Sequence, residues 1–221
     1  MASDLAARNR SHFNHVASTY DSDFEDTLRA LANAVQARHD WIGVDWDGPV
    51  KVLDYACGTG VISRALKPYA TKLVGVDVSD EMVAKYNAHA RALGSDPEKM
   101  SAILFSDSKF FDFNLIVIGM ALHHMDDPTY AIRCLGERLK KGGVLVVIDR
   151  LLPLDIYDEN IGDAVKTITR RGFTKDHMRT IFKEAGVDGR FDIDVVPEPV
   201  FLRQGGMELK LTMFFARGDR V

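Results

Sequence analysis

The stretch Val52-Leu53-Asp54-Tyr55-Ala56-Cys57-Gly58-Thr59-Gly60 is the most informative part of this 221-residue chain. An apolar run that ends in an acid and a Gly-x-Gly turn is typical of a buried parallel strand whose backbone approaches a ligand. A second apolar run, 72–77, also ends in an acid, Asp77. Because the carboxyl ends of parallel strands meet at one edge of a sheet, these two tips predict a nucleotide-type pocket there.

Apolar segments alternate with helical ones after residue 49. Periodicity and caps predict helices over residues 61–67, 80–93, 128–140 and 175–185. Apolar, β-branched runs predict strands over residues 50–54, 73–77, 101–105, 113–122, 144–149, 193–202 and 207–216. Strands without polar alternation, separated by helices, indicate an α/β fold with a mostly parallel sheet and helices on both faces. The turn Gln204-Gly205-Gly206 predicts an antiparallel hairpin at the edge of this sheet.

The first 48 residues are predicted to form an N-terminal helical cap on a main domain of residues 49–221. Phe13, Val16, Ala17 and Tyr20 recur at the spacing of one helical face. A turn-rich segment, 43–49, separates this region from the first strand. We expect the cap and the main domain to form a single compact unit.

Composition excludes several classes of protein. The formal charge is −4 without a block of Lys and Arg, so a nucleic-acid or membrane surface is not expected. The two cysteines, Cys57 and Cys134, form no C-x-x-C pair, which argues against a disulfide framework or a zinc site. The polar first ten residues do not resemble a signal peptide, and the longest apolar run, 115–122, is too short to span a bilayer. We expect a soluble cytoplasmic protein, a monomer or a homodimer.

A dinucleotide site is the first alternative for the glycine turn. Its fingerprint, G-x-G-x-x-G/A, requires Gly or Ala where this chain has Ser63. Asp54 would also repel a pyrophosphate, whereas it suits a ligand that carries an ammonium group. A nicotinamide-dependent oxidoreductase is therefore the less favoured reading, and the chain has no Tyr-x-x-x-Lys pair to act on a hydride acceptor.

The segment Asp54-x-Ala56-x-Gly58-x-Gly60 resembles motif I of the class I S-adenosylmethionine-dependent methyltransferases, which carry glycine where Ala56 stands. Tyr20-Asp21 resembles the cap segment of that family, residues 113–124 resemble its motif IV, and residues 139–143 resemble the turn before its fifth strand. The resemblance covers about residues 10–218. It implies a Rossmann-like, seven-stranded, mostly parallel sheet with an antiparallel edge hairpin.

The resemblance also implies a cofactor site for S-adenosyl-L-methionine, with S-adenosyl-L-homocysteine as the product. Asp77 is expected to hold the ribose hydroxyls, Asp54 to face the ammonium group, and Tyr20 to close over the cofactor. The complete set of implied cofactor-binding residues is Tyr20, Asp54, Ala56, Gly58, Thr59, Gly60, Asp77, Val78, Met82, Asp107, Gly119, Met120 and Ala121.

Two departures from the family pattern keep a second reading open. Motif IV usually has an acid where Asn114 stands, and only residues 105–112 separate the third strand from it. This segment is short for the family, and Asp107 is its candidate for the adenine side. A cofactor-binding module without catalysis, which regulates a partner, remains the alternative.

The pair His123-His124 follows the strand of motif IV and is expected at the carboxyl edge of the sheet. Histidine titrates near neutral pH and can take a proton from a hydroxyl or amine as a methyl group moves. Both are candidate catalytic bases; the alternative is that they only pack before the next helix. Adjacent residues point in different directions, so we expect no metal site here.

The acceptor is expected to be a small, partly apolar molecule. The favoured position of methylation is an oxygen atom; nitrogen is the second choice and carbon the third. Its candidate binding residues are His12, His15, Phe24 and Tyr157. The histidines are three apart and share a helical face, although both also suit a solvated surface. Arg170-Arg171 is expected to be a solvated pair. The alternative is that the two side chains bind the acceptor, if the acceptor is an anion.

Overall fold

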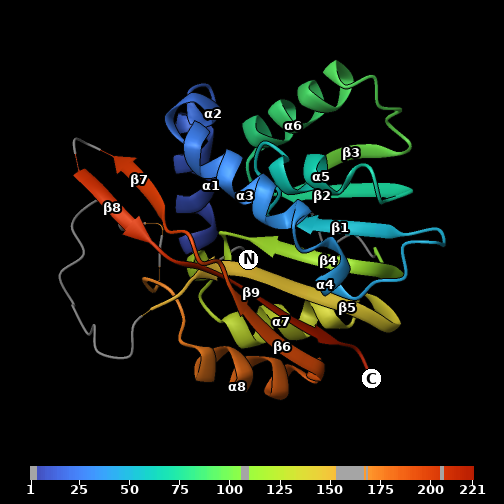
Figure 1. The fold of residues 1–221 in the computed structure, drawn as a ribbon. Helices are drawn as coiled ribbons and strands as arrows, with labels where there is room; N and C mark the ends of the chain where they lie inside the picture. Colours follow the sequence, from blue (N-terminus) through green and yellow to red (C-terminus); the bar gives the residue numbers. More distant parts are fainter. Residues whose placement is uncertain (1–3, 106–109, 153–166, 168, 205–206) are drawn as a thin grey trace.

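The computed structural model describes residues 4–105, 110–152, 167, 169–204 and 207–221 (Figure 1). Its helices are α1 (Asp4–Val16), α2 (Tyr20–Asp23), α3 (Glu25–Gln36), α4 (His39–Ile42), α5 (Val61–Leu66), α6 (Asp80–Ala92), α7 (Pro128–Gly136), α8 (Lys175–Ala185) and the 3-10 turn η1 (Leu122–His124). Its strands are β1 (Lys51–Tyr55), β2 (Lys72–Asp77), β3 (Met100–Leu104), β4 (Phe113–Gly119), β5 (Leu139–Arg150), β6 (Gly189–Val195), β7 (Val200–Gln204), β8 (Met207–Leu211) and β9 (Met213–Asp219).

The described strands form a seven-stranded sheet in the order β3-β2-β1-β4-β5-β9-β6. The first five run parallel to one another, and β9 pairs antiparallel with both β5 and β6. The predicted fold class, an α/β sheet that is mostly parallel with an antiparallel edge, is therefore confirmed.

The predicted edge hairpin is wrong in its details. Segment 193–202 divides into β6 and β7, and segment 207–216 divides into β8 and β9. Pro197 and Pro199 separate β6 from β7, because proline has no backbone N–H to donate to a sheet. The strands β7 and β8 pair only with each other, as a separate two-stranded sheet, and the edge of the main sheet is made by β9 and β6.

Two predicted boundaries around motif IV are also wrong. The helix predicted over 128–140 ends at Gly136, because Leu139 is buried and already pairs with Phe113 as the start of β5. The strand predicted over 113–122 ends at Gly119, because Met120 turns the backbone into the left-handed region with φ +53°. The side chains of Ser79 and Thr174 cap α6 and α8, because they accept hydrogen bonds from backbone N–H groups in the first turn of each helix.

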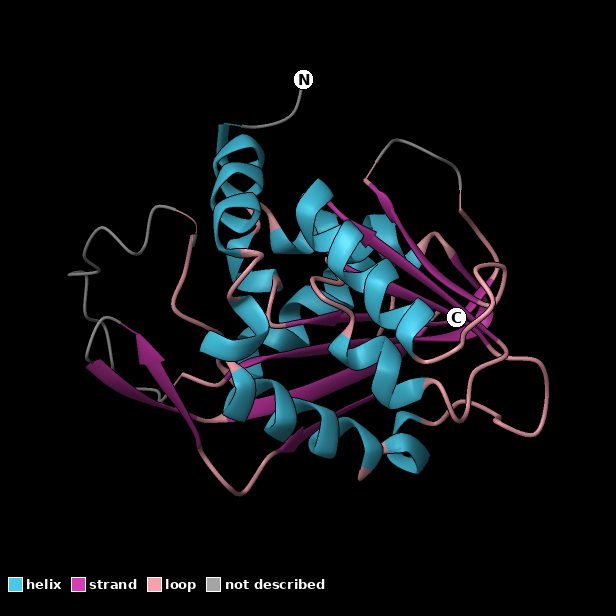
Figure 2. Cartoon of the chain, turned by 90° about the horizontal axis from the view of Figure 1, so that it is seen from above, coloured by secondary structure: helices cyan, strands magenta, loops and turns pink. Residues whose placement is uncertain are grey.

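Both faces of the sheet are covered by apolar residues, and helices lie on both sides of the strands in Figure 2. Neighbours along β1 alternate between the two clusters: Val52 belongs to one and Leu53 to the other. The first cluster also contains Leu31 and Val35 from α3 and Ile42 from α4. The N-terminal helices therefore share the main core rather than forming one of their own.

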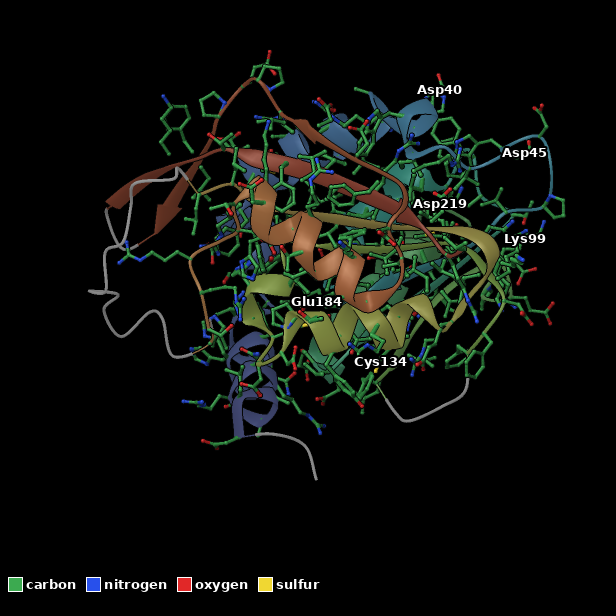
Figure 3. All side chains as sticks on the ribbon, turned by 90° about the horizontal axis from the view of Figure 1, so that it is seen from below. Asp40, Asp45, Lys99, Cys134, Glu184 and Asp219 are labelled. Atoms are coloured by element: carbon green, nitrogen blue, oxygen red, sulfur yellow. The ribbon has the colours of Figure 1, made fainter. Side chains whose placement is uncertain are left out.

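The carboxyl ends of the parallel strands face α1, α2 and the β7–β8 hairpin, which lie on one side of the molecule in Figure 1. Asp45 and Lys99, which precede β1 and β3, lie at the end of the sheet away from the hairpin in Figure 3. A ligand at the carboxyl edge would therefore lie under the N-terminal helices. Among the described helices, none has the length and apolar content needed to cross a membrane.

Candidate functional site

The glycine turn after β1 follows a left-handed path. Ala56, Gly58 and Gly60 have φ values of +56°, +50° and +87°. A Cβ on Gly60 would lie 2.5 Å from a ring carbon of Tyr86, so only glycine fits there. A Cβ on Gly58 would meet no protein atom within 4 Å, which leaves open space above the turn. The turn is thus packed against Tyr86 at Gly60 and open to a ligand at Gly58.

Asp77, at the tip of β2, is tied to this turn. Its two carboxylate oxygens accept hydrogen bonds from the backbone N–H of Gly58 at 2.8 Å and of Ser79 at 2.9 Å. Burial raises the pKa of Asp77 above its ordinary value, and the backbone hydrogen bonds oppose that rise. The carboxylate therefore joins the glycine turn to the start of α6.

Asp54, the last acid of β1, is only 1% exposed. Its Oδ2 accepts hydrogen bonds from the Ser63 hydroxyl at 2.7 Å and from the Ser63 backbone N–H at 3.1 Å. Burial raises the pKa of Asp54 to about 7, despite these hydrogen bonds. Asp54 thus caps the first turn of α5, and the serine at the third fingerprint position is its partner.

The Tyr20-Asp21 segment lies over the glycine turn. Asp21 Oδ1 accepts a hydrogen bond from the Thr59 hydroxyl at 2.7 Å, and its Oδ2 lies 3.3 Å from His89 Nε2. Burial, followed by the charges of Asp77 and Asp21, raises the pKa of Tyr20 to about 12, so its hydroxyl keeps its proton. Sequence reasoning quoted Asp21 only as part of a motif and missed its contact with the turn.

Helix α1 crosses the carboxyl edge of the sheet. Toward the β2 side, Asn14 Oδ1 accepts a hydrogen bond from the Ser79 hydroxyl at 2.5 Å, and Arg10 contacts Asp80 at 3.1 Å. From the middle of the helix, the Asn9 side-chain amide donates to the carbonyl of His124 at 3.2 Å. One helix therefore covers both the β2 tip and the segment after β4.

The backbone after β4 turns as sharply as the one after β1. A Cβ on Gly119 would lie 2.1 Å from Ile62 Cδ1, so Gly119 packs closely against the Ile62 side chain of α5. Met120 donates its backbone N–H to the Ile148 carbonyl at 2.7 Å, and Ala121 is half-buried. These residues bring the chain to η1 at the same edge as the glycine turn.

Both ring nitrogens of His123 are occupied, and its side chain is 1% exposed. Nδ1 lies 2.8 Å from Asp149 Oδ1, and Nε2 lies 2.6 Å from Arg150 Nη2. A guanidinium only donates, so Nε2 accepts and Nδ1 carries the hydrogen that Asp149 receives. His123 has no nitrogen left for a substrate proton in this arrangement, which argues against the base predicted at this position.

His124 is arranged differently. Its Nδ1 donates to the Thr167 carbonyl at 2.7 Å, and its ring packs edge-on against Phe13 with centroids 5.4 Å apart. Within the described part of the chain, no hydrogen bond is formed to its Nε2. Burial lowers the pKa of His124 to about 3, so the ring is neutral at pH 7 and Nε2 is a hydrogen-bond acceptor.

Residues 11–189 match the protein family described as a methyltransferase domain. This match covers most of the chain. The chain belongs to the class I S-adenosylmethionine-dependent methyltransferases.

Relatives and solved structures agree with this family. An uncharacterized methyltransferase of Schizosaccharomyces pombe is 28% identical over 268 positions, covering 99% of this chain and 94% of that protein. A ubiquinone biosynthesis O-methyltransferase of Pelagibacter ubique is 30% identical, over 44% of this chain and 41% of that protein. Magnesium protoporphyrin IX methyltransferase of Synechocystis PCC 6803, solved with bound SAM, superposes with a TM-score of 0.65 at 15% identity, covering 99% of each chain.

The remaining residues implied by the methyltransferase resemblance differ in their placement. Val78 is half-buried, whereas Met82 is buried inside α6. His12 and Phe24 are half-buried, and Phe24 packs against the Tyr20 ring with centroids 4.8 Å apart. His15 is exposed. Asp107 and Tyr157 lie outside the described residues.

Asp149 and Arg150 are the functional candidates that sequence reasoning missed in this methyltransferase. They end β5, so the same edge rule that placed His123 at the carboxyl edge applies to them. A buried acid and a cation at a strand tip were the available signal. Within the described residues, no group of three or more His, Cys, Asp or Glu side chains could hold a metal ion.

Proposed function

We propose that this methyltransferase transfers the methyl group of S-adenosyl-L-methionine to an oxygen atom of a small, partly apolar acceptor. The observation that carries the proposal is the position of α1, which is bonded to Ser79 near its C-terminal end and to His124 from its middle. A helix that lies over both halves of the carboxyl edge obstructs a folded protein or a nucleic-acid duplex.

The residues around the glycine turn fit the cofactor. The space above Gly58 is open to a ligand, and the Asp77 carboxylate accepts backbone hydrogen bonds from Gly58, Val78 and Ser79. Because an ionised carboxylate has about four acceptor positions, Asp77 keeps capacity for a ribose hydroxyl. No described donor contacts Asp54 Oδ1, so this oxygen would accept the ammonium group. Thr59 and Gly60 complete the turn, and Tyr20 would close it from above. Gly119, Met120 and Ala121 would line the side of the methyl group.

S-adenosyl-L-methionine, when bound, supplies an electrophilic methyl group. The chain then has to exclude water and hold the acceptor oxygen in line with that group. Phe13 packs between the rings of His124 and Tyr20, at centroid distances of 5.4 and 6.5 Å, and forms an apolar wall on the acceptor side. His124 Nε2 would accept a hydrogen bond from an acceptor hydroxyl, and His123 would hold Arg150 in place.

Methylation of oxygen is supported by the name of the Pelagibacter relative, an O-methyltransferase, and by the neutral acceptor atom His124 Nε2. A hydroxyl donates one hydrogen bond to such an atom and keeps its lone pairs directed elsewhere.

The test uses cofactor with a labelled methyl group and a cell extract divided into small-molecule and macromolecular fractions. We expect label in the small-molecule fraction, on a compound that gains one methyl group bound to oxygen. Label only in protein or nucleic acid would contradict the proposal, as would a product methylated on nitrogen or carbon.

A further inference from the structure

The short helix α2, which carries Tyr20 and Asp21, has no fully buried residue among its four. Desolvation and then the charge of Asp77 raise the pKa of the Tyr20 hydroxyl, which places that hydroxyl near the carboxylate proposed to bind ribose. A segment with so little buried apolar surface opens easily unless polar contacts hold it. The contacts of Asp21 therefore decide how firmly Tyr20 stays over the glycine turn.

Asp21 is bonded through both of its carboxylate oxygens. Oδ1 accepts a hydrogen bond from the Thr59 hydroxyl of the glycine turn at 2.7 Å, and Oδ2 lies 3.3 Å from Nε2 of His89 in α6. One helical turn before His89, the Nζ of Lys85 donates to the Ser18 carbonyl at 3.4 Å. Residues four apart share a helical face, so one face of α6 contacts both α2 and the residues before it.

The direction of the His89 contact is set by Arg64 of α5. Arg64 Nη1 lies 2.9 Å from His89 Nδ1 and 2.5 Å from the Thr59 carbonyl oxygen. This nitrogen carries two hydrogens and only donates, so it can serve both acceptors. The Thr59 carbonyl also lies 3.0 Å from His89 Nδ1, but Nδ1 cannot donate to it while it accepts from Arg64. In the neutral ring, Nε2 then carries the hydrogen that Asp21 receives.

The same series of groups, a guanidinium, an imidazole and a carboxylate, occurs on the acceptor side in Arg150, His123 and Asp149. There the imidazole and carboxylate side chains are 1% and 0% exposed, whereas those of His89 and Asp21 are 32% and 35% exposed. Contacts that water reaches are weaker and break more easily than buried ones. The series at Asp21 therefore suits a segment that opens to admit a cofactor and closes again.

We propose that His89 is a positioning residue of the cofactor site: its Nε2–H holds the Asp21 carboxylate, and Asp21 keeps Tyr20 over the bound cofactor. His89 acts through Asp21 and does not itself touch the cofactor. Because Tyr20 covers the cofactor only while α2 is in place, the His89 contact slows dissociation of the cofactor more than it changes association. This inference rests on the proposed function, in which Tyr20 closes the cofactor site.

The experiment measures the association and dissociation rates of S-adenosyl-L-homocysteine by surface plasmon resonance, on variants whose thermal unfolding shows that they are folded. His89→Leu removes both ring nitrogens, and Asp21→Ala removes the carboxylate. We expect each to raise the dissociation rate roughly three- to tenfold and to leave the association rate within about twofold. His89→Gln should keep most of the wild-type behaviour, because its amide offers both an acceptor and a donor.

A double-mutant cycle with Tyr20→Ala separates positioning from a general effect on structure. In the Tyr20→Ala background, His89→Leu should change the dissociation rate by less than about twofold, because the ring that Asp21 keeps in place is gone. A purely structural contribution of His89 would persist in that background.

The matched control is His39→Leu. The His39 side chain is 31% exposed and its Nε2 lies 3.1 Å from Asp40 Oδ1, but it belongs to α4 and not to the cofactor side. This variant should leave both rates unchanged.

Failure of the wild-type protein to bind S-adenosyl-L-homocysteine would overturn the proposed function itself. If that ligand binds, three results would each overturn the positioning role of His89. The first is an unchanged dissociation rate in both His89→Leu and Asp21→Ala. The second is the same increase for His89→Leu in the Tyr20→Ala background. The third is an equal increase in both rates, which would leave the affinity unchanged.

Discussion

The tips of β1 and β4, which are neighbours in the sheet, leave their strands in the same way. The residue after each strand is a non-glycine in the left-handed region, Ala56 with φ +56° and Met120 with φ +53°. The polar side chains near these two strand tips are held differently. Asp54 is bonded to Ser63, nine positions away, whereas His123 is bonded to Asp149 and Arg150, more than twenty positions away.

This difference separates the proposed cofactor half, built within one strand–turn–helix unit and its neighbour, from the proposed acceptor half, which is assembled by three distant segments. The acids of the cofactor half are held mainly by backbone N–H groups and one hydroxyl. Asp149, the acid of the proposed acceptor half, is held by the His123 side chain as well as by backbone N–H groups. We therefore expect substitutions in the acceptor half to reduce stability and those in the cofactor half to reduce affinity.

The largest effect is expected for Asp149→Asn. The carboxylate of Asp149 now accepts three hydrogen bonds inside the protein. The N–H group of an asparagine amide would face one of these three donors and leave it without an acceptor. We expect a loss of about 3 kcal/mol in the free energy of unfolding, and a thermal midpoint lower by roughly 6–12 °C. Thermal and denaturant unfolding measure this. Affinity for S-adenosyl-L-homocysteine should stay within about twofold where both proteins are folded.

The matched control is Asp26→Asn, because Asp26 pairs with Arg29 on the surface, where both side chains are mostly exposed. It should lose less than about 1 kcal/mol. Equal losses in the two variants, or a large loss of cofactor affinity in Asp149→Asn, would contradict the separation into two halves.

The second effect is expected for Asp77→Asn. The substitution keeps the size of the side chain and removes the negative charge that faces the proposed ribose position. Hydrogen bonds to a charged group contribute about 1.5–3 kcal/mol, so affinity for S-adenosyl-L-homocysteine should fall by roughly tenfold or more. Calorimetric titration measures it. Asp80→Asn, a change in the next acid along the chain, should alter affinity by less than about threefold; an unchanged affinity in Asp77→Asn would refute the ribose assignment.

The cofactor half could be predicted from the sequence because its contacts are local. The acid, the glycines and the serine that receives Asp54 all lie within one short motif, and the second acid ends the next strand. The mostly parallel sheet with helices on both faces followed from the alternation of strands and helices. The last two β segments divide at two prolines, and only one strand from each segment joins the edge of the main sheet. The apolar pattern alone does not specify which strand pairs there.

The acceptor half was predicted only in its position. The edge rule placed His123 and His124 correctly at the carboxyl ends of the strands, but their chemistry depends on partners from other segments. Arg150 occupies His123 Nε2, and Thr167 selects the tautomer of His124. No spacing in the sequence encodes such contacts, because they form only after β4, β5 and the segment before α8 have packed.

The third prediction concerns protons. The pKa of Asp54 is raised from 3.8 to about 7, so between about pH 4 and 7 the folded state holds a proton that the unfolded state releases. Stability from this group is therefore greatest at low pH and is lost as the pH rises through that window. His124, with its pKa lowered to about 3, acts oppositely: its contribution is lost as the pH falls from about 6.5 toward 3.

Cofactor binding should reveal the Asp54 proton directly. An ammonium group beside Asp54 lowers its pKa, so binding of S-adenosyl-L-homocysteine near pH 7 should release a fraction of a proton. Calorimetry in two buffers with different ionisation enthalpies measures that fraction. Asp54→Asn should abolish it, and His124→Gln should leave it unchanged. Proton uptake by the wild-type protein would show that the ammonium group lies elsewhere.

The smallest effect is expected at the two matched strand tips. A left-handed conformation costs an alanine roughly 1 kcal/mol, and glycine relieves it at the expense of a more flexible unfolded chain. Ala56→Gly should therefore raise the free energy of unfolding by a few tenths of a kcal/mol, up to about 1 kcal/mol. Met120→Gly relieves the same conformation but removes a side chain that packs against the core, so it should be neutral or destabilising. Unfolding by denaturant compares the two. A higher free energy of unfolding in both variants would show that backbone strain outweighs packing at each tip. A lower free energy of unfolding in Ala56→Gly would show that the Ala56 methyl group, like the Met120 side chain, makes stabilising contacts.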